Sequence, residues 1–167
     1  RDVTAEAGLD SQDQAHAGVF VDFDNAGDKD LLLARYLAPC RLYRNDGNGR
    51  FQDASAKSGL DLSAPCTSVC TLDYDRDGQL DIYVGVYGDA FNASPDVFFY
   101  ATNARANRLF RNVDGVRFED VSQQAGVDST GWTLAVTAGD YDNDGDADLA
   151  LANDFGRKVL YQNQGDG

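Results

Sequence analysis

One loop pattern organises the chain, and its clearest copy reads Asp140-Tyr141-Asp142-Asn143-Asp144-Gly145-Asp146-Ala147-Asp148. Asp stands at positions 1, 3, 5 and 9 of this loop, and Gly stands at position 6. Nearly the same pattern occurs twice more, as Asp73-Tyr74-Asp75-Arg76-Asp77-Gly78-Gln79-Leu80-Asp81 and as Asp22-Phe23-Asp24-Asn25-Ala26-Gly27-Asp28-Lys29-Asp30. Self-similarity of this kind indicates a repeat architecture.

Two further phrases accompany each loop. The first precedes the loop at the same offset in every copy and covers residues 2–10, 53–61 and 120–128; its second copy reads Asp-Ala-Ser-Ala-Lys-Ser-Gly-Leu-Asp. The second follows the loop and covers residues 41–45, 108–112 and 159–163; its first copy reads Arg-Leu-Tyr-Arg-Asn. Because the loop and the two phrases recur in the same order, the sequence predicts one repeat domain over 1–167, with repeats at about 2–52, 53–119 and 120–167. An insertion at about 88–106 lengthens the second repeat.

The segments that flank each loop have the length and composition of β-strands. Those before the loops are 18–21, 69–72 and 135–139, and those after are 31–34, 82–86 and 149–152. The Arg-Leu-Tyr-Arg phrase alternates polar and apolar residues, as a third strand does, and Gly-rich turns lead to fourth strands at Phe51 and Phe118. The sequence therefore predicts an all-β fold made of β-propeller blades, each with four antiparallel strands. Three repeats are too few to close a ring, so we expect a partial propeller or a segment of a larger one.

The acidic loops have the spacing of a hard-cation site. Carboxylates at alternate positions of a tightly wound loop can turn inward, Gly at position 6 permits the turn, and a backbone carbonyl at position 7 adds an oxygen. Oxygen ligands in such number favour calcium over zinc, copper or magnesium. The sequence predicts two well-formed Ca²⁺ sites, one at Asp73, Asp75, Asp77, Gln79 and Asp81, and one at Asp140, Asp142, Asp144, Asp146 and Asp148.

The first loop departs from this pattern because Ala26 replaces the carboxylate at position 5. Its set is Asp22, Asp24, Asp28 and Asp30, and we expect this site to bind weakly or to stay empty. An EF-hand is excluded, since position 12 is Leu33, Val84 or Leu151 where an EF-hand requires a bidentate Glu.

The combination of loop and phrases resembles the FG-GAP or VCBS-type repeats of integrin α-chain propellers. It is most similar to the branch of ASPIC/UnbV and cartilage acidic proteins. The resemblance covers nearly the whole chain and implies an extracellular propeller with calcium in a hairpin loop of each blade. By this resemblance the position 1, 3, 5 and 9 carboxylates are the metal ligands.

Composition limits the partners. Of the 28 acidic residues all but Glu6 and Glu119 are Asp, and the formal net charge of −14 argues against a nucleic-acid partner. No stretch reaches the roughly 20 apolar residues of a membrane span. The chain does not begin with Met, so a signal peptide would lie outside it, and we expect a secreted or cell-surface location.

The sequence favours a binding role over catalysis. It contains one histidine, His16, and no nucleophile elbow or zinc-protease motif, so we predict no enzyme and no catalytic residue. The expected role is structural, adhesive or protein-binding, and the partner is an extracellular protein, a glycan or another copy of the chain. Copies could assemble head to tail if the N-terminal strand of one completed the third blade of the next.

The alternative is a carbohydrate-binding part of a glycan-active enzyme, or that enzyme itself, with Trp132 and the aromatic run 98–100 as stacking surfaces. The three cysteines leave two possibilities open. Cys66 and Cys70 are too far apart on one strand to pair, so Cys40 bridges one of them or all three are buried thiols.

Overall fold

The computed structural model describes residues 1–9, 14–88 and 94–165, and they fold into three antiparallel β-sheets. The first sheet has the order β1 (Ala15–Val21), β2 (Asp30–Arg35), β3 (Arg41–Asn45) and β4 (Phe51–Asp53). The second has β5 (Cys66–Leu72), β6 (Asp81–Val86), β7 (Arg108–Asn112) and β8 (Phe118–Asp120). The third, within the described residues, has β9 (Thr133–Gly139), β10 (Asp148–Asn153) and β11 (Val159–Tyr161). The prediction of an all-β fold of antiparallel propeller blades is confirmed, with four strands in each of the first two blades and three in the described part of the third.

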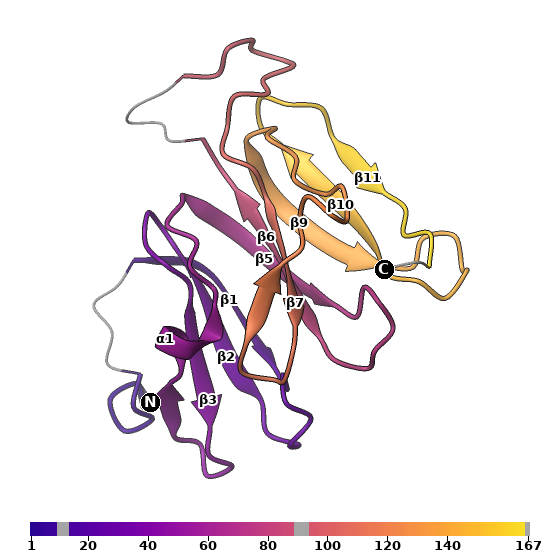
Figure 1. Ribbon diagram of the computed structural model, residues 1–167. Coiled ribbons are helices and arrows are strands. Elements are labelled where there is room, and N and C mark those ends of the chain that lie inside the picture. Colours follow the sequence, from indigo (N-terminus) through magenta and orange to yellow (C-terminus); the bar gives the residue numbers. More distant parts are fainter. Residues whose placement is uncertain (10–13, 89–93, 166–167) are drawn as a thin grey trace.

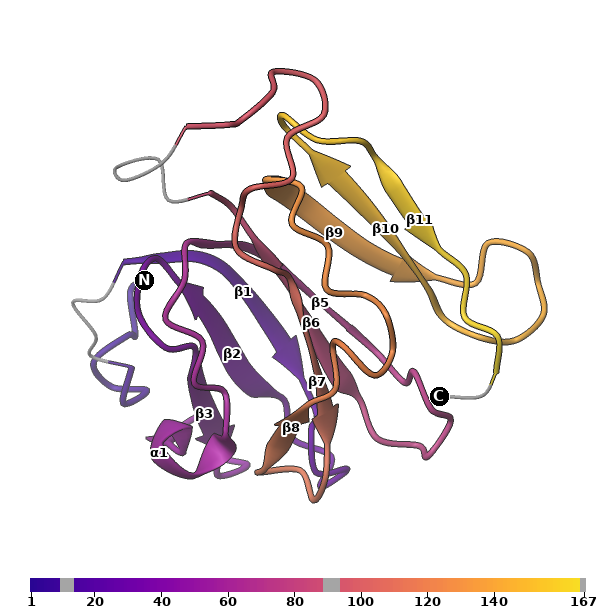
Figure 2. The ribbon, with the colours of Figure 1, turned by 45° about the horizontal axis from the view of Figure 1, so that its top comes forward.

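The three sheets follow one another as blades along an open arc (Figure 1). The first strand of each sheet is the innermost, and β5 lies between β1 and β9. The view in Figure 2 shows the same succession from indigo through orange to yellow. The described residues form no closed ring.

The first strand of each blade begins a few residues earlier than its apolar pattern predicts. In blade 1 the pairing of β1 with β2 shifts register between Ala15 and Ala17, and in blade 2 the pairing of β5 with β6 shifts between Cys66 and Ser68. A β-bulge at this point lets the strand continue although the alternation of inward and outward side chains is broken. Periodicity alone therefore misses these strand ends.

Short turns join consecutive blades. Residues 55–58 form α1 (Ser55–Ser58), the one α-helix of the described residues, and Gly59 ends it with a positive φ of 74°. A Cβ on Gly59 would come within 2.5 Å of the Phe118 carbonyl oxygen, so this Gly is required by close contact with blade 2. No helix in the described part of the chain has the length and apolarity to cross a membrane.

The core consists of two apolar clusters that lie between neighbouring blades. Blades 1 and 2 share a cluster that includes Phe23, Leu42, Ile82 and Phe118. Blades 2 and 3 share one that includes Tyr83, Leu109 and Leu151. Because neither cluster belongs to a single sheet, each blade depends on its neighbour for burial, as in other repeat proteins.

The aromatic residue at loop position 2 shows this dependence directly. Phe23 is fully buried, because Phe118 of blade 2 packs on it edge to face at a centroid distance of 5.3 Å. Tyr74 is 8% exposed beside blade 3, whereas Tyr141 in blade 3 is 53% exposed. A blade therefore covers the aromatic residue of the blade that precedes it.

The insertion in the second repeat leaves the sheet between β6 and β7. Its residues 89–93 lie outside the described part of the chain. The following segment exposes Phe98, Phe99 and Tyr100, and Arg157 lies 5.0 Å from the centre of the Tyr100 ring.

Candidate metal centre

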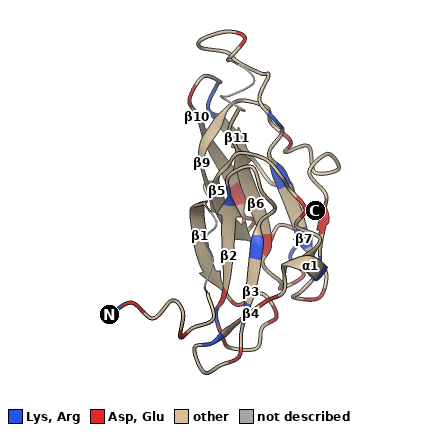
Figure 3. Ribbon diagram, turned by 90° about the vertical axis from the view of Figure 1, so that its left-hand side faces the viewer, with Lys and Arg blue, Asp and Glu red and all other residues tan. Residues whose placement is uncertain are grey.

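The three acidic loops connect the first and second strands of their blades, and they share one backbone conformation. Position 4 is a non-Gly residue with a positive φ in every copy, at Asn25 (56°), Arg76 (60°) and Asn143 (62°). The Gly at position 6 also has a positive φ, between 84° and 93°. Acidic residues are concentrated in loops at the ends of the strands (Figure 3). The common backbone explains why the Asp spacing repeats so closely.

In the second loop the structure brings three carboxylates together. Asp73, Asp75 and Asp81 each offer an oxygen, and these oxygens lie within 4.8 Å of one another. Asp81 is the first residue of β6 and is fully buried; it accepts hydrogen bonds from the backbone N–H groups of Tyr74 (2.9 Å) and Asn112 (2.7 Å). Because two blade elements fix its position, Asp81 forms the floor of the loop.

The third loop repeats this arrangement with Asp140, Asp142 and Asp148, whose oxygens also lie within 4.8 Å of one another. The buried Asp148 accepts hydrogen bonds from the backbone N–H groups of Tyr141 (3.0 Å) and Asn163 (2.9 Å). Positions 1, 3 and 9 are therefore the carboxylates that converge in both loops.

Two observations on the second loop fit a cation. The Oδ2 atom of Asp73 accepts a hydrogen bond from Gly78 N (3.0 Å), but its Oδ1 is buried without a hydrogen-bond partner. Burial raises the pKa of Asp81 to about 7, against the hydrogen bonds it accepts, and the charges of Asp75 and Asp77 raise it further. A positive charge nearby would give the buried Asp73 oxygen a partner and would favour the ionised form of Asp81.

The remaining predicted residues lie beside these groups of three without joining them. Asp77 accepts from the backbone N–H of Gln79 (2.8 Å), and the side chain of Gln79 turns back to Asp77. Asp144 accepts from Asp146 N (2.9 Å), and the buried Asp146 forms an ion pair with Arg76 of the second loop.

The first loop holds its carboxylates differently. Both oxygens of Asp22 are hydrogen-bonded to backbone N–H groups, from Ala26 (3.0 Å) and Gly27 (2.8 Å). The guanidinium group of Arg44 forms ion pairs with Asp24 and Asp30, the latter at 3.0 Å. Burial opposes the ionisation of Asp24, but the hydrogen bond and charge of Arg44 outweigh it and lower its pKa. The first loop thus already contains a cation, the guanidinium group of Arg44. Asp28, the remaining predicted residue, lies at the edge of this loop near Gly47.

Asparagine side chains join the second and third blades to the blade before them. The Nδ2 of Asn112 donates to the Phe23 carbonyl of blade 1 (2.8 Å) and to the Leu80 carbonyl of its own loop (3.1 Å). Asn163 in blade 3 makes the matching bond to the Tyr74 carbonyl of blade 2 (2.8 Å). The sequence shows these Asn residues in a repeated phrase, but their contact with the preceding blade is visible only in the structure.

The prediction that Trp132 is a stacking surface for sugars is wrong. Trp132 is 1% exposed, its Nε1 donates to Asn103 (2.9 Å), and Tyr87 and Phe155 pack on its ring edge to face. A Trp before an apolar strand indicates burial as readily as exposure. Phe98–Tyr100 alone of the predicted aromatic surface reaches solvent.

The cysteines are free thiols, and two of them are neighbours. Cys40 and Cys66 are buried in the core between blades 1 and 2, and a hydrogen bond joins their side chains. Cys70 packs against the other cluster, between blades 2 and 3. The structure therefore favours Cys66 over Cys70 as the neighbour of Cys40.

Blades of antiparallel strands with an acidic hairpin loop in each define a class of β-repeat proteins, and the similarity of this chain to known proteins agrees with that class. The family of FG-GAP-like repeats matches residues 22–84 and 92–151, more than half of the sequence, so the chain belongs to this family. Among curated proteins, mouse cartilage acidic protein 1 is 31% identical over 155 residues and human cartilage acidic protein 1 is 28% identical over 160 residues. These matches cover 92% and 91% of this chain, but the chain spans only 22% of the length of either relative.

Proposed function

We propose that the chain is a calcium-binding module of an extracellular protein, with a structural, adhesive or protein-interaction role and no bond-breaking chemistry. The observation that carries this proposal is that the same three carboxylates, at positions 1, 3 and 9, converge in both the second and the third loop. Like charges held this close repel one another unless a cation offsets them. A single such group would be ordinary surface acidity, but two in the same place on successive blades indicate a built site.

The ligands proposed for the second loop are Asp73, Asp75 and Asp81, and those for the third are Asp140, Asp142 and Asp148. Asp77 and Asp144, with the backbone carbonyls of Gln79 and Asp146, complete the two sets at positions 5 and 7. Bound calcium would supply the positive charge that these loops lack and would hold each hairpin closed. All-oxygen ligands favour calcium over zinc, and the flexible loop favours it over magnesium.

The proposed extracellular location rests on the relatives and on the chemistry. The names of the two curated relatives include the word cartilage, and extracellular calcium modules have dissociation constants of about 10⁻⁴–10⁻³ M. Neither the FG-GAP-like repeat nor these relatives suggests an enzyme. We propose that each of the repeats at about 2–52, 53–119 and 120–167 forms one blade.

Calcium titration by isothermal calorimetry, combined with thermal unfolding in calcium, magnesium and chelator, tests the proposal. We expect two calcium ions per chain, a lower melting temperature in chelator, and little effect of magnesium. Asp75→Ala and Asp142→Ala should each remove one ion, while Asp24→Ala should leave the number unchanged. Binding of no calcium at millimolar concentration would contradict the proposal.

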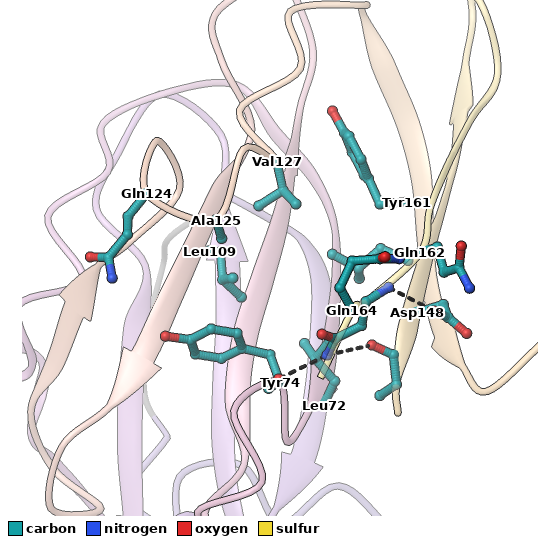
Figure 4. Close-up of a pocket in the computed structure, with 13 residues that line it drawn as sticks. Leu72, Tyr74, Leu109, Gln124, Ala125, Val127, Asp148, Tyr161, Gln162 and Gln164 are labelled. Carbon is teal, nitrogen blue, oxygen red and sulfur yellow. Dashed lines mark hydrogen bonds between the residues drawn. The ribbon is translucent and has the colours of Figure 1, made fainter. Parts of the chain in front are cut away.

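A second proposed function, head-to-tail assembly of copies, is supported by the edge of blade 3. A cavity of about 240 Å³ lies between blades 2 and 3, and Tyr74, Leu109 and Tyr161 are among the residues around it (Figure 4). At the corresponding place between blades 1 and 2, Phe118 of β8 packs on Phe23. A strand added beside β11, such as the N-terminal segment of another copy, would bring side chains to this cavity.

Light scattering of the purified chain, coupled to size exclusion, tests the assembly. Head-to-tail contact predicts a mass that rises with concentration and returns to that of a monomer when residues 1–9 are deleted. A monomer at all concentrations would exclude assembly and leave the calcium proposal untouched.

A further inference from the structure

We infer that Arg44 is a built-in cation that takes the place of calcium in the first loop, and that Gln52 is the residue that allows Arg44 to do so. The inference deepens the proposed calcium function, because it explains which loops take metal and which does not. It concerns side chains outside the nine-residue loop, where the spacing of Asp gives no information.

The position of Arg44 is the first argument. Its guanidinium group lies between Asp24 and Asp30, at loop positions 3 and 9. The corresponding carboxylates in the other two loops belong to the groups that converge. A third contact, from Nη1 to the Gly115 carbonyl (3.2 Å), ties the same guanidinium group to the turn of blade 2. Arg44 is thus held at the place where the other loops gather negative charge.

The charge balance is the second argument. The first loop has lost the position-5 carboxylate, since this residue is Ala26. Exchange of a divalent ion for the monovalent guanidinium group removes one positive charge, and the loss of the carboxylate removes one negative charge. Counted over positions 1, 3, 5 and 9, the first loop with Arg44 therefore has the same net charge as the second loop would have with calcium.

The comparison with blade 2 is the third argument. Arg111 occupies the same place in β7 as Arg44 in β3. It pairs with Glu119, however, and the loop carboxylate Asp75 acts on it only through its charge. The cross-strand partner of Arg111 is Glu119, and the two side chains form an ion pair at 2.8 Å. The cross-strand partner of Arg44 is the neutral Gln52. An opposite charge directly across the ladder attracts Arg111 outward, and Gln52 exerts no such attraction on Arg44.

The third blade shows what happens without arginine. Gln162 stands at the same place of the phrase, and its side-chain amide donates to Asp142 at 2.6 Å. Gln162 reaches position 3 of the loop without supplying a charge. The three blades therefore give three outcomes at one position: a cation within the loop, a cation held outside it, and a neutral donor.

The count of calcium ions per chain tests the inference directly. The double variant Ala26→Asp/Arg44→Gln restores the carboxylate and removes the guanidinium group, and it should bind three ions where the natural sequence binds two. Ala26→Asp alone should still bind two, because Arg44 remains in place. If Ala26→Asp alone binds three, or if the double variant binds no more than the natural sequence, the inference is wrong.

Unfolding in chelator tests the same inference without metal. We expect Arg44→Gln to lower the melting temperature, since it leaves Asp24 and Asp30 facing each other without a cation. The matched control Arg111→Gln removes an exposed ion pair and should cause a much smaller shift. Gln52→Glu should lower the melting temperature in the direction of Arg44→Gln, because it offers Arg44 the partner that Glu119 offers Arg111.

Equal shifts for Arg44→Gln and Arg111→Gln in chelator would overturn the inference, even if the natural sequence binds two calcium ions. If the natural sequence binds none, the calcium proposal fails while the chelator experiment still decides the role of Arg44. A larger shift for Arg44→Gln in that case would support the built-in cation. The two proposals therefore fail separately.

Discussion

Replacement of Asn112 by Ala would remove the side-chain hydrogen bond that joins blade 2 to the Phe23 carbonyl of blade 1, together with two bonds within blade 2. The buried side chain makes three hydrogen bonds in all: Nδ2 donates to the carbonyls of Phe23 and Leu80, and Oδ1 accepts from Gly115 N (2.7 Å). The backbone bond from Asn112 N to Asp81 survives the change. At about 0.5–1.5 kcal/mol for each hydrogen bond, the loss of three should lower the free energy of unfolding by about 3 kcal/mol.

Asn45→Ala is the matched control. Asn45 holds the same position of the same phrase, but its side chain bonds within blade 1, to the Lys29 carbonyl (2.9 Å) and from Gly47 N (3.1 Å), where both bonds are exposed. Groups that water can reach lose little when a partner is removed, so we expect a cost of about 1 kcal/mol.

Urea unfolding at one fixed calcium concentration, followed by circular dichroism, measures both variants. The conclusion depends on the difference between them, because each removes the same side chain from an equivalent turn. Equal costs for Asn112→Ala and Asn45→Ala would refute the view that the Asn side chain stabilises the contact between blades.

Three other predictions concern the core, the thiols and the metal. Gly88→Ala should shift the emission of Trp132, the one tryptophan, to longer wavelength, because a Cβ there would come within 2.2 Å of its ring; unchanged emission would contradict this. Oxidation by glutathione disulfide should join Cys40 to Cys66, so that thiol titration in denaturant then finds one thiol, Cys70. The Cys66→Ser variant should keep two thiols after the same treatment, and three thiols in the oxidised natural sequence would exclude the bridge. Calcium at a hundredfold excess over its dissociation constant should raise the free energy of unfolding by about 2.7 kcal/mol per site, and a urea midpoint independent of calcium would contradict it.

The sequence predicts the fold well because three phrases repeat in phase. β3 and the starts of β4 and β8 agree with the prediction, since alternation and Gly-rich turns define them. The early starts of β1 and β5 could not be predicted, because a bulge interrupts the alternation there. The role of Trp132 was also beyond reach, since a single aromatic residue gives no sign of which side it faces.

The sequence predicts the composition of the site better than its contacts. The exceptional first loop could be recognised from Ala26, and its Asp residues are not among the groups that converge in the described residues. The reason could not be recognised, because the phrases of Arg44 and Arg111 are nearly identical. The difference lies in Gln52 and Glu119, on the next strand, and only the register of the ladder shows that they are the partners.

The exposure of the loop aromatic residue rises from Phe23 through Tyr74 to Tyr141, so the row of three blades has a direction. The aromatic residue of each loop is covered by the blade that follows, so its burial depends on residues later in the chain. A blade placed after the third would bury Tyr141 as blade 2 buries Phe23. The added blade would therefore stabilise the acidic loop of the third blade, which is already present. Truncation from the C-terminal side would accordingly uncover the aromatic residue of an acidic loop that it leaves intact, whereas truncation from the N-terminal side would uncover the blade 2 side of the first core cluster, including Ile82 and Phe118.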